Sequence, residues 1–211
     1  VDLAAAGLAT MFCNVTGVTI ATGLSSGLET IASQLYGAAQ YHQVGVATQR
    51  TLLVILVALI PVAFLWLFTG QMLVAVGIEH EVAQKAALFA NVMILGLPAI
   101  AMQETVRKYL QCQGIMTPFV FVATICNFFH VGMCVLFISP GNLSWGLSGA
   151  ALTLVISYYL NNLLVFAYCR WSGAHKLTWG GWTWECMDHI WPFLKLAVPG
   201  AGMICMEWWC F

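Results

Sequence analysis

Long apolar runs separated by short polar stretches form the main pattern of this chain. Each run continues for about 20 residues or more without regular alternation of apolar and polar positions, which is typical of membrane-spanning helices. A transmembrane β-strand would need that alternation, so helices are favoured over a barrel. The runs predict about six transmembrane helices, over residues 3–36, 51–69, 86–106, 118–138 and 147–169, with the last beginning at residue 192.

The first run is too long for one straight crossing. A helix over residues 3–36 would extend about 50 Å, whereas the hydrocarbon layer is about 30 Å thick. We therefore expect this helix to tilt, or to protrude from the membrane at its Gly37-Ala38 end. Glycine recurs along it, which indicates close helix packing or a bend, with packing preferred. These glycines are at positions 7, 17, 23, 27 and 37.

The composition supports a membrane protein. Hydrophobic residues make up 61% of the 211 residues and charged residues only 7%, against about 25% charged residues in soluble domains. The net charge of −1 leaves no basic excess for binding nucleic acid. Eight cysteines are scattered without a Cys-x-x-Cys pair or zinc-ligand spacing, so we interpret them as small packing residues.

Basic residues predict the orientation of the helices. Six of the seven lie in or next to the polar segments after the first, third and fifth predicted spans, and only Lys85 lies on the other side. Basic segments stay in the cytoplasm, so these three segments are expected to be cytoplasmic. The chain would then start on the outer face without an initiator Met, and we expect it to be a fragment of a longer protein. The six residues are Arg50, Arg107, Lys108, Arg170, Lys176 and Lys195.

The longest polar stretch, residues 171–191, contains Trp-Gly-Gly-Trp-Thr-Trp at 179–184. Indole rings favour the membrane interface, so this stretch is expected to be an amphipathic cytoplasmic linker. It would divide the chain into an N-terminal unit (residues 1–170), the linker (171–191) and the truncated start of a second unit (192–211).

One carboxylate, Glu207, lies within the last apolar run. A helix from Lys195 to Glu207 spans about 18 Å, which places the acid far from either membrane edge. Such an acid usually faces a cavity, a partner charge or a proton path. Burial disfavours the charged form, so Glu207 is the first candidate for binding and releasing a proton. The alternative is a structural acid paired with a helix outside this chain.

Pro199 precedes Glu207 by about two turns. Proline leaves a backbone carbonyl unpaired, and broken helices are common at transporter binding sites. Further candidates for a cavity or a helix break are Met203, Trp208, Asn127, Asn161 and Gln34.

Two other acids have more ordinary interpretations. Glu29, near the cytoplasmic end of the first span, is either a gate or cavity wall or a water-accessible interfacial carboxylate, and the second is preferred. Glu104 has Lys108 at i+4, which predicts an ion pair on one helix face.

Polar residues on the fourth and fifth spans favour hydrogen bonds between helices. Asn127 and His130 share a helix face, and Asn161 and Asn162 lie on the next span. A metal site would need further ligands at suitable spacing, and none is present. The sequence also lacks a nucleophile elbow, a P-loop, a Rossmann glycine pattern and an HExxH motif, so we do not expect an enzyme.

Five stretches together resemble the multidrug and toxic compound extrusion (MATE) family of transporters, most of all its plant detoxification type. Pro199 is followed by Gly200 where that family usually has serine. The stretches are Gly27-Leu-Glu-Thr30 with Gln34-Leu-Tyr-Gly-Ala38; Gln49-Arg50; Arg107-Lys-Tyr-Leu-Gln-Cys-Gln113; Gly146-Leu-Ser-Gly-Ala-Ala151 with Ile156-Ser-Tyr-Tyr-Leu-Asn161; and Leu194-Lys-Leu-Ala-Val-Pro199 with Cys205-Met-Glu-Trp-Trp209.

The resemblance implies helices 2–6 of the first lobe and most of helix 7 of a twelve-helix, two-lobe fold. It also implies a monomeric antiporter in the plasma or vacuolar membrane, exporting organic, cationic or amphiphilic molecules by alternating access. The implied coupling ion is H⁺, with Na⁺ as the alternative, and no cofactor is implied. The acid in the family's seventh helix, implicated in proton and substrate binding, matches Glu207. The competing hypotheses are a truncated protein that does not transport and, less favoured, a membrane receptor or lipid-modifying enzyme.

Overall fold

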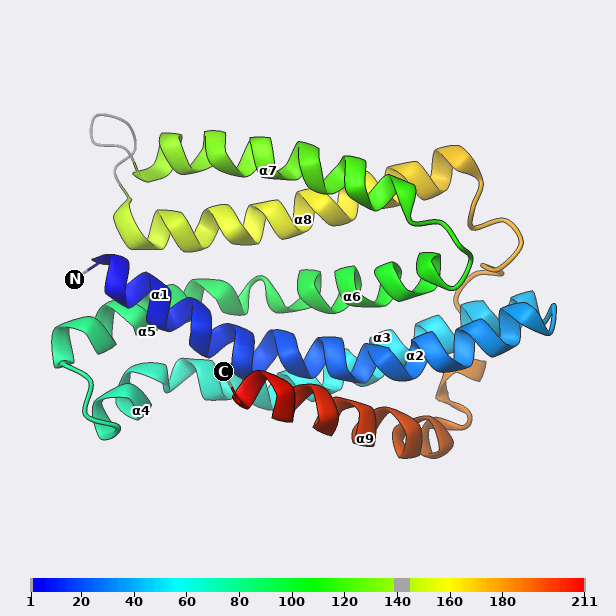
Figure 1. The fold of residues 1–211 in the computed structure, drawn as a ribbon, viewed down its shortest axis with the longest axis horizontal. Coiled ribbons are helices and arrows are strands. Elements are labelled where there is room, and N and C mark those ends of the chain that lie inside the picture. The colour runs from blue at the N-terminus through cyan, green and yellow to red at the C-terminus, as the bar shows by residue number, and fades with distance from the viewer. Residues whose placement is uncertain (1, 139–144, 211) are drawn as a thin grey trace.

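The computed structural model describes residues 2–138 and 145–210, which fold as helices and connecting segments (Figure 1). The first helix is continuous through α1, a π-helical segment and α2. A short 3₁₀ turn, Trp184–Met187, lies in the linker. The bounds are α1 Asp2–Cys13, π-helix Asn14–Val18, α2 Thr19–Gly37, α3 Tyr41–Leu67, α4 Thr69–Ala75, α5 His80–Ile94, α6 Leu97–Gln111, α7 Thr117–Ile138, α8 Gly146–Ser172 and α9 Ile190–Trp209.

Four helices in the described part of the chain are long and apolar enough to cross a membrane, and a fifth span results if α5 and α6 count as one. The four are the continuous α1–α2 helix, α3, α7 and α8. This confirms the all-helical membrane fold. The sixth predicted run does form a helix, α9, but it carries Lys195 and Glu207 and is not among these candidate spans.

Two predicted boundaries were wrong. The third run is not one straight helix, because α5 and α6 meet at an angle of 57°. Gly96 lies at this bend, where an added Cβ would be 3.3 Å from Val155 Cγ2 of α8, and Pro98 opens α6. The second run begins at Tyr41 rather than at residue 51, because α3 continues beyond the apolar layer with polar residues that contact the linker.

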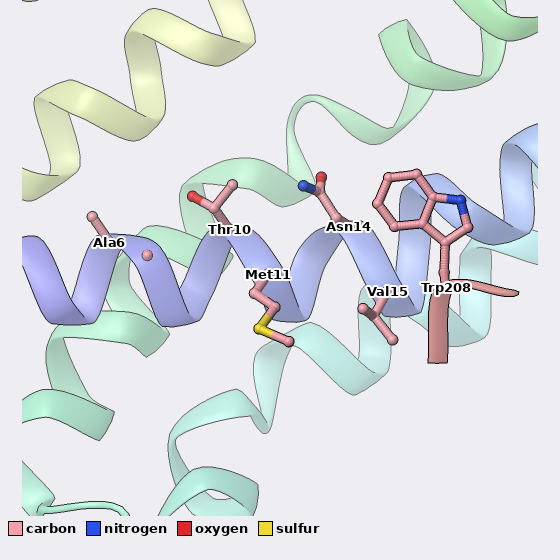
Figure 2. A pocket seen from close by; sticks show the side chains of 7 residues that line it. Ala6, Thr10, Met11, Asn14, Val15 and Trp208 are labelled. Atoms are coloured by element: carbon pink, nitrogen blue, oxygen red, sulfur yellow. The ribbon is translucent and has the colours of Figure 1, made fainter. Parts of the chain in front are cut away.

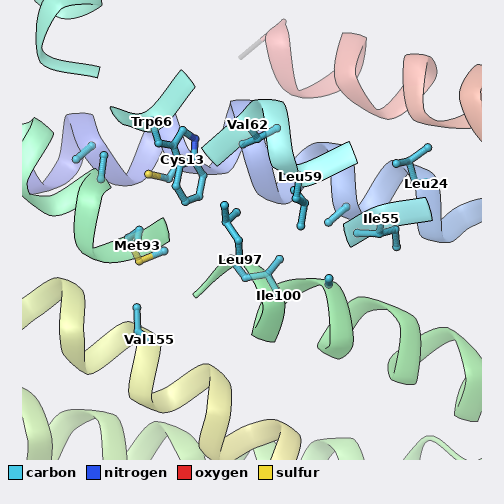
Figure 3. Packing of buried hydrophobic residues seen from close by; sticks show 14 of the residues in the cluster. Cys13, Leu24, Ile55, Leu59, Val62, Trp66, Met93, Leu97, Ile100 and Val155 are labelled. Carbon is cyan, nitrogen blue, oxygen red and sulfur yellow. The ribbon is translucent and has the colours of Figure 1, made fainter. Parts of the chain in front are cut away.

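A large apolar core joins most of the helices (Figure 3), and a second, smaller cluster joins α2, α3, α6, α7 and α8. The following side chains belong to the large core. Its largest fully buried side chains are Trp66 of α3, Phe89 of α5 and Phe193 of α9. Trp66 also explains the π-helical segment, because its indole packs against Gly17 and its Nε1 donates a hydrogen bond of 2.8 Å to Thr16 Oγ1. The wider π-helical turn and the missing Cβ of Gly17 together accommodate the ring.

Helix α9 packs closely along α2 (Figure 1). A Cβ added to Gly23 would lie 2.6 Å from Ala201 Cα, and one added to Gly27 would lie 2.9 Å from Ala197 Cβ. The two helices therefore meet through small residues spaced four apart on each side, an arrangement that lets backbones approach within a membrane. This contact, the α2–α9 seam, sets the position of Glu207 and Trp208.

The linker that precedes α9 is docked on the first helices. Gln49, 1% exposed, donates from Nε2 to Gly181 O at 2.6 Å and accepts at Oε1 from Thr183 N at 3.0 Å. Arg50 donates to two linker carbonyls, those of Cys186 and Glu185, at 3.2 and 3.3 Å. The Gln49 side chain, near the N-terminal end of α3, thus satisfies two backbone groups of a segment without regular structure.

The end of α6 completes this attachment. The hydroxyls of Tyr109 and Thr178 are hydrogen bonded and both residues are buried, while Trp179 packs edge-on against Tyr109 with ring centroids 6.5 Å apart. The chain then turns into α9 at His189, whose φ of 56° lies in the left-handed region. The linker therefore belongs to the packing of α3 and α6, and the direction of α9 is set next to His189.

Candidate functional site

Glu207 lies in the last two turns of α9, two residues before the helix ends at Trp209. Its side chain is exposed, and it has no ion pair or hydrogen-bond partner among residues 2–138 and 145–210. A free carboxylate of this kind within a run of Met, Cys and Trp is available to bind a proton or a cation. The α2–α9 seam holds the helix that carries it.

The adjacent Trp208 lines a pocket of about 520 Å³ between α9 and the first helix (Figure 2). Figure 2 shows its indole beside the π-helical segment that carries Asn14 and Val15. The volume lies within the range of about 300–1,000 Å³ that small-molecule sites occupy. The other lining residues are Ala6, Gly7, Thr10 and Met11.

The pocket lining is mostly apolar, with two neutral polar side chains. Thr10 is on α1, and Asn14 is the first residue of the π-helical segment. π-Helical turns occur frequently at functional sites, because they redirect the side chains that follow. The pocket therefore offers an apolar wall and one aromatic face, that of Trp208.

Asn14 is a functional candidate that sequence reasoning missed. It is the only amide or charged side chain between residues 3 and 28, and this isolation is the signal that would have identified it. Thr10 has no comparable signal, because Thr and Ser recur along the same run.

The remaining predicted site residues lie away from this pocket. Helix α9 continues through Pro199 without interruption, and both Pro199 and Met203 are exposed. Gln34 is exposed near the opposite end of α2, while Asn127 and Asn161 lie on α7 and α8. A second pocket, of about 630 Å³ between α4 and α5, is lined by none of them.

The predicted Glu104–Lys108 pair is wrong. Glu104 pairs with Arg107 at 2.5 Å, whereas Lys108 reaches across to Glu29 of α2. Glu29 also accepts a hydrogen bond of 2.7 Å from Gln111 Nε2. Its side chain is 40% exposed, so Glu29 is water-accessible as predicted, and it also ties α2 to the end of α6.

The predicted hydrogen bonds between helices are confirmed for two residues. Asn162 Nδ2 of α8 donates to Ala99 O of α6 at 2.8 Å, and His130 Nδ1 of α7 lies 2.9 Å from Ser157 Oγ of α8. All eight cysteines are free; Cys13, Cys126 and Cys186 are buried, whereas Cys210 is exposed.

A bundle of apolar helices, several of them long enough to cross a membrane, is typical of a polytopic membrane protein. The family model described as MatE matches residues 1–136, which is more than half of the chain. The chain belongs to the MATE family of transporters, and these transporters are integral membrane proteins. Members of this family are not enzymes.

Two named relatives are similar to this chain along almost its whole length. Protein DETOXIFICATION 16 of Arabidopsis thaliana is 38% identical over 209 residues, covering 99% of this chain and 43% of that protein. Multidrug and toxin extrusion protein 2 of Mus musculus is 36% identical over 211 residues, covering 100% of this chain and 36% of that protein. The chain therefore spans less than half the length of these relatives.

Solved structures show the same fold. The crystal structure of the eukaryotic MATE transporter AtDTX14 superposes with a TM-score of 0.91 at 30% identity, covering 98% of this chain and 46% of that one. A multidrug resistance MATE family transporter in an inward-facing conformation has a TM-score of 0.76 at 16% identity, which indicates the fold alone.

Proposed function

We propose that this chain forms the first lobe and the opening helix of a secondary transporter that exports organic small molecules in exchange for protons. The names of its relatives, multidrug and toxin extrusion and DETOXIFICATION, favour xenobiotic substrates. The observation that carries the proposal is the unpaired Glu207 carboxylate on α9, one residue before Trp208, which lines an apolar pocket. The transporter would lie in the plasma or vacuolar membrane. It would act as a monomer.

Competition at Glu207 would provide the coupling. A carboxylate binds either a proton or an organic cation, so protonation from the acidic side releases the substrate that the charged form holds. A ligand shifts a conformational equilibrium only by its differential affinity for the two states, so each occupant must favour a different arrangement of the lobes. The small-residue α2–α9 seam joins the helix that carries Glu207 closely to α2, so a movement of α9 would be felt by the first lobe.

The favoured substrates are cationic or amphiphilic. Most of the pocket wall is apolar, and Thr10 and Asn14 offer hydrogen bonds without charge. A proton is preferred over Na⁺ as the coupling ion, because a metal cation requires several oxygen ligands around one point. Among the residues that the structure describes, no group of three or more His, Cys, Asp or Glu side chains is arranged to hold a metal ion.

The test uses the 211-residue chain in proteoliposomes with an imposed pH gradient, loaded with a fluorescent organic cation. Efflux driven by the gradient is expected in the parent chain and lost in Glu207→Gln. The control is Glu79→Gln, which removes an exposed carboxylate from the loop before α5. Gradient-driven efflux in Glu207→Gln equal to that of a transporting parent chain would refute the role of Glu207.

Binding separates this hypothesis from that of a fragment that does not transport. Tryptophan fluorescence should report organic-cation binding to the parent chain, weakened at least tenfold by Glu207→Gln and unchanged by Glu79→Gln. Binding without efflux would favour the fragment, and neither binding nor efflux would reject the pocket as a substrate site.

A further inference from the structure

An ionisable side chain lies within the candidate membrane span α7, on a different element from Glu207. His130 is on α7 and is partly buried where α7 packs against α8. Its Nδ1 lies 2.9 Å from Ser157 Oγ, and its Nε2 lies 3.5 Å from Cys134 Sγ. Ionisable residues within membrane spans are costly, so they are rare and usually functional.

The Ser157 hydroxyl determines which ring nitrogen carries the hydrogen. Its own hydrogen is donated to Thr153 O at 2.8 Å. A hydroxyl has only one hydrogen; with that hydrogen donated to Thr153 O, Ser157 Oγ is left to accept from His130, and the imidazole hydrogen is then on Nδ1. The basic lone pair of the neutral ring is then on Nε2, and it faces the Cys134 thiol, a weak donor.

The surroundings of the ring hold no fixed charge. α8 is the main packing partner of α7, and Arg170 is the only Lys, Arg, Asp or Glu in the two helices. Arg170 lies about 20 Å beyond Ser157 along α8. Of the tyrosines next to Ser157, Tyr159 donates to Leu95 O at 2.9 Å and Tyr158 packs against the main core.

We propose that His130 is a second proton-binding site of this chain, with Nε2 as the atom that takes the proton. On protonation a new N–H bond forms at Nε2 with a proton from water, and the ring becomes an imidazolium. The Nδ1–H bond to Ser157 is kept, while the new Nε2–H points at Cys134 Sγ and the thiol hydrogen rotates away. The cation would have only a hydroxyl and a sulfur as partners, so its formation weakens the contact between α7 and α8.

This inference does not depend on transport or on Glu207, because it concerns a ring on another helix and is tested on the chain by itself. The measurement is ¹⁵N NMR of the 211-residue chain in lipid nanodiscs with labelled histidine. The His130 signals are assigned by their loss in His130→Gln. The other four histidines, at 42, 80, 175 and 189, lie outside α7 and α8.

Spectra are recorded over a range of about pH 8 to 5; the neutral ring is expected as the Nδ1–H tautomer, and the doubly protonated ring is expected to form on acidification. Ser157→Ala removes the acceptor, so the neutral ring should change to the Nε2–H tautomer. The control is Thr124→Ala, which removes an exposed hydroxyl of α7 that bonds to Val120 O, and it should leave the tautomer unchanged.

Three results would overturn the proposal: an Nε2–H tautomer in the parent chain, a ring that stays neutral across the pH range, or an unchanged tautomer in Ser157→Ala. If Ser157→Ala does not fold, the tautomer and titration of the parent chain decide alone.

Discussion

Replacement of Gln49 by alanine should release the linker from α3. The Gln49 side chain holds Gly181 O and Thr183 N at the same time, and it is almost completely buried. Alanine cannot make either bond, so both backbone groups lose their partner without gaining water as long as the segment stays docked.

The size of the effect follows from these two bonds. Each contributes about 1 kcal/mol net, and a buried group left without a partner costs about 1–3 kcal/mol. The free energy that favours the docked linker over the released one should therefore fall by about 2–3 kcal/mol. Since 1.4 kcal/mol corresponds to a factor of ten, the released fraction should rise about 30- to 100-fold.

Alkylation of Cys186 measures that fraction. This thiol is in the docked segment and is 5% exposed, whereas Cys210 is exposed. Peptide-resolved labelling with N-ethylmaleimide should show Cys186 reacting about 30- to 100-fold faster in Gln49→Ala, in proportion to the released fraction. Cys210 serves as the internal reference and should react at an unchanged rate.

The matched control is Gln43→Ala, an exposed glutamine on the same helix whose side chain makes no hydrogen bond in the described residues. Cys186 should react there as in the parent chain. A Cys186 rate that differs less than twofold between Gln49→Ala and the parent would show that Gln49 does not hold the linker.

Other changes test the remaining contacts. Gly23→Ala should displace α9, because the new Cβ would lie 2.6 Å from Ala201 Cα. Gly202→Ala should not displace it, because Gly202 has open space around it. The displacement is measured as a lower crosslinking yield between α2 and α9. Lys108→Met should lower the melting temperature by breaking the contact with Glu29, and exchanging the two residues should partly restore it. Trp66→Ala should destabilise the chain by about 3–5 kcal/mol in denaturant unfolding, and a loss below 1 kcal/mol would contradict its role in the core.

The lengths of the apolar runs predicted those helices that have polar residues at both ends. Helices α7 and α8 begin and end within a few residues of their predicted limits. The start of α3 was missed because a helix need not stop at the membrane edge: Gln49 and Arg50 continue it while contacting the linker. The bend before α6 depends on how closely α8 approaches Gly96, which local sequence does not record.

The candidate site was predictable only in part. Glu207 stands out because an acid within an apolar run has few explanations. The pocket beside it joins residues almost two hundred positions apart, so neither Asn14 nor its proximity to Trp208 follows from spacing along the chain. The error at Glu104 has the same origin, since i+4 spacing identifies neighbours on one helix but not Glu29 arriving from another.

The docked linker determines where this chain can be divided. A cut between residues 188 and 189 leaves the hydrogen bonds of Gln49 and Arg50 to the linker in one piece, and α9 in the other. The α2–α9 seam is then the main contact that returns the short piece to the long one. A cut at residue 173 instead leaves the linker and α9 together in the short piece, which can return through both the contacts to Gln49 and Arg50 and the seam. Two co-expressed pieces divided at 173 should therefore reassemble more tightly than pieces divided at 188.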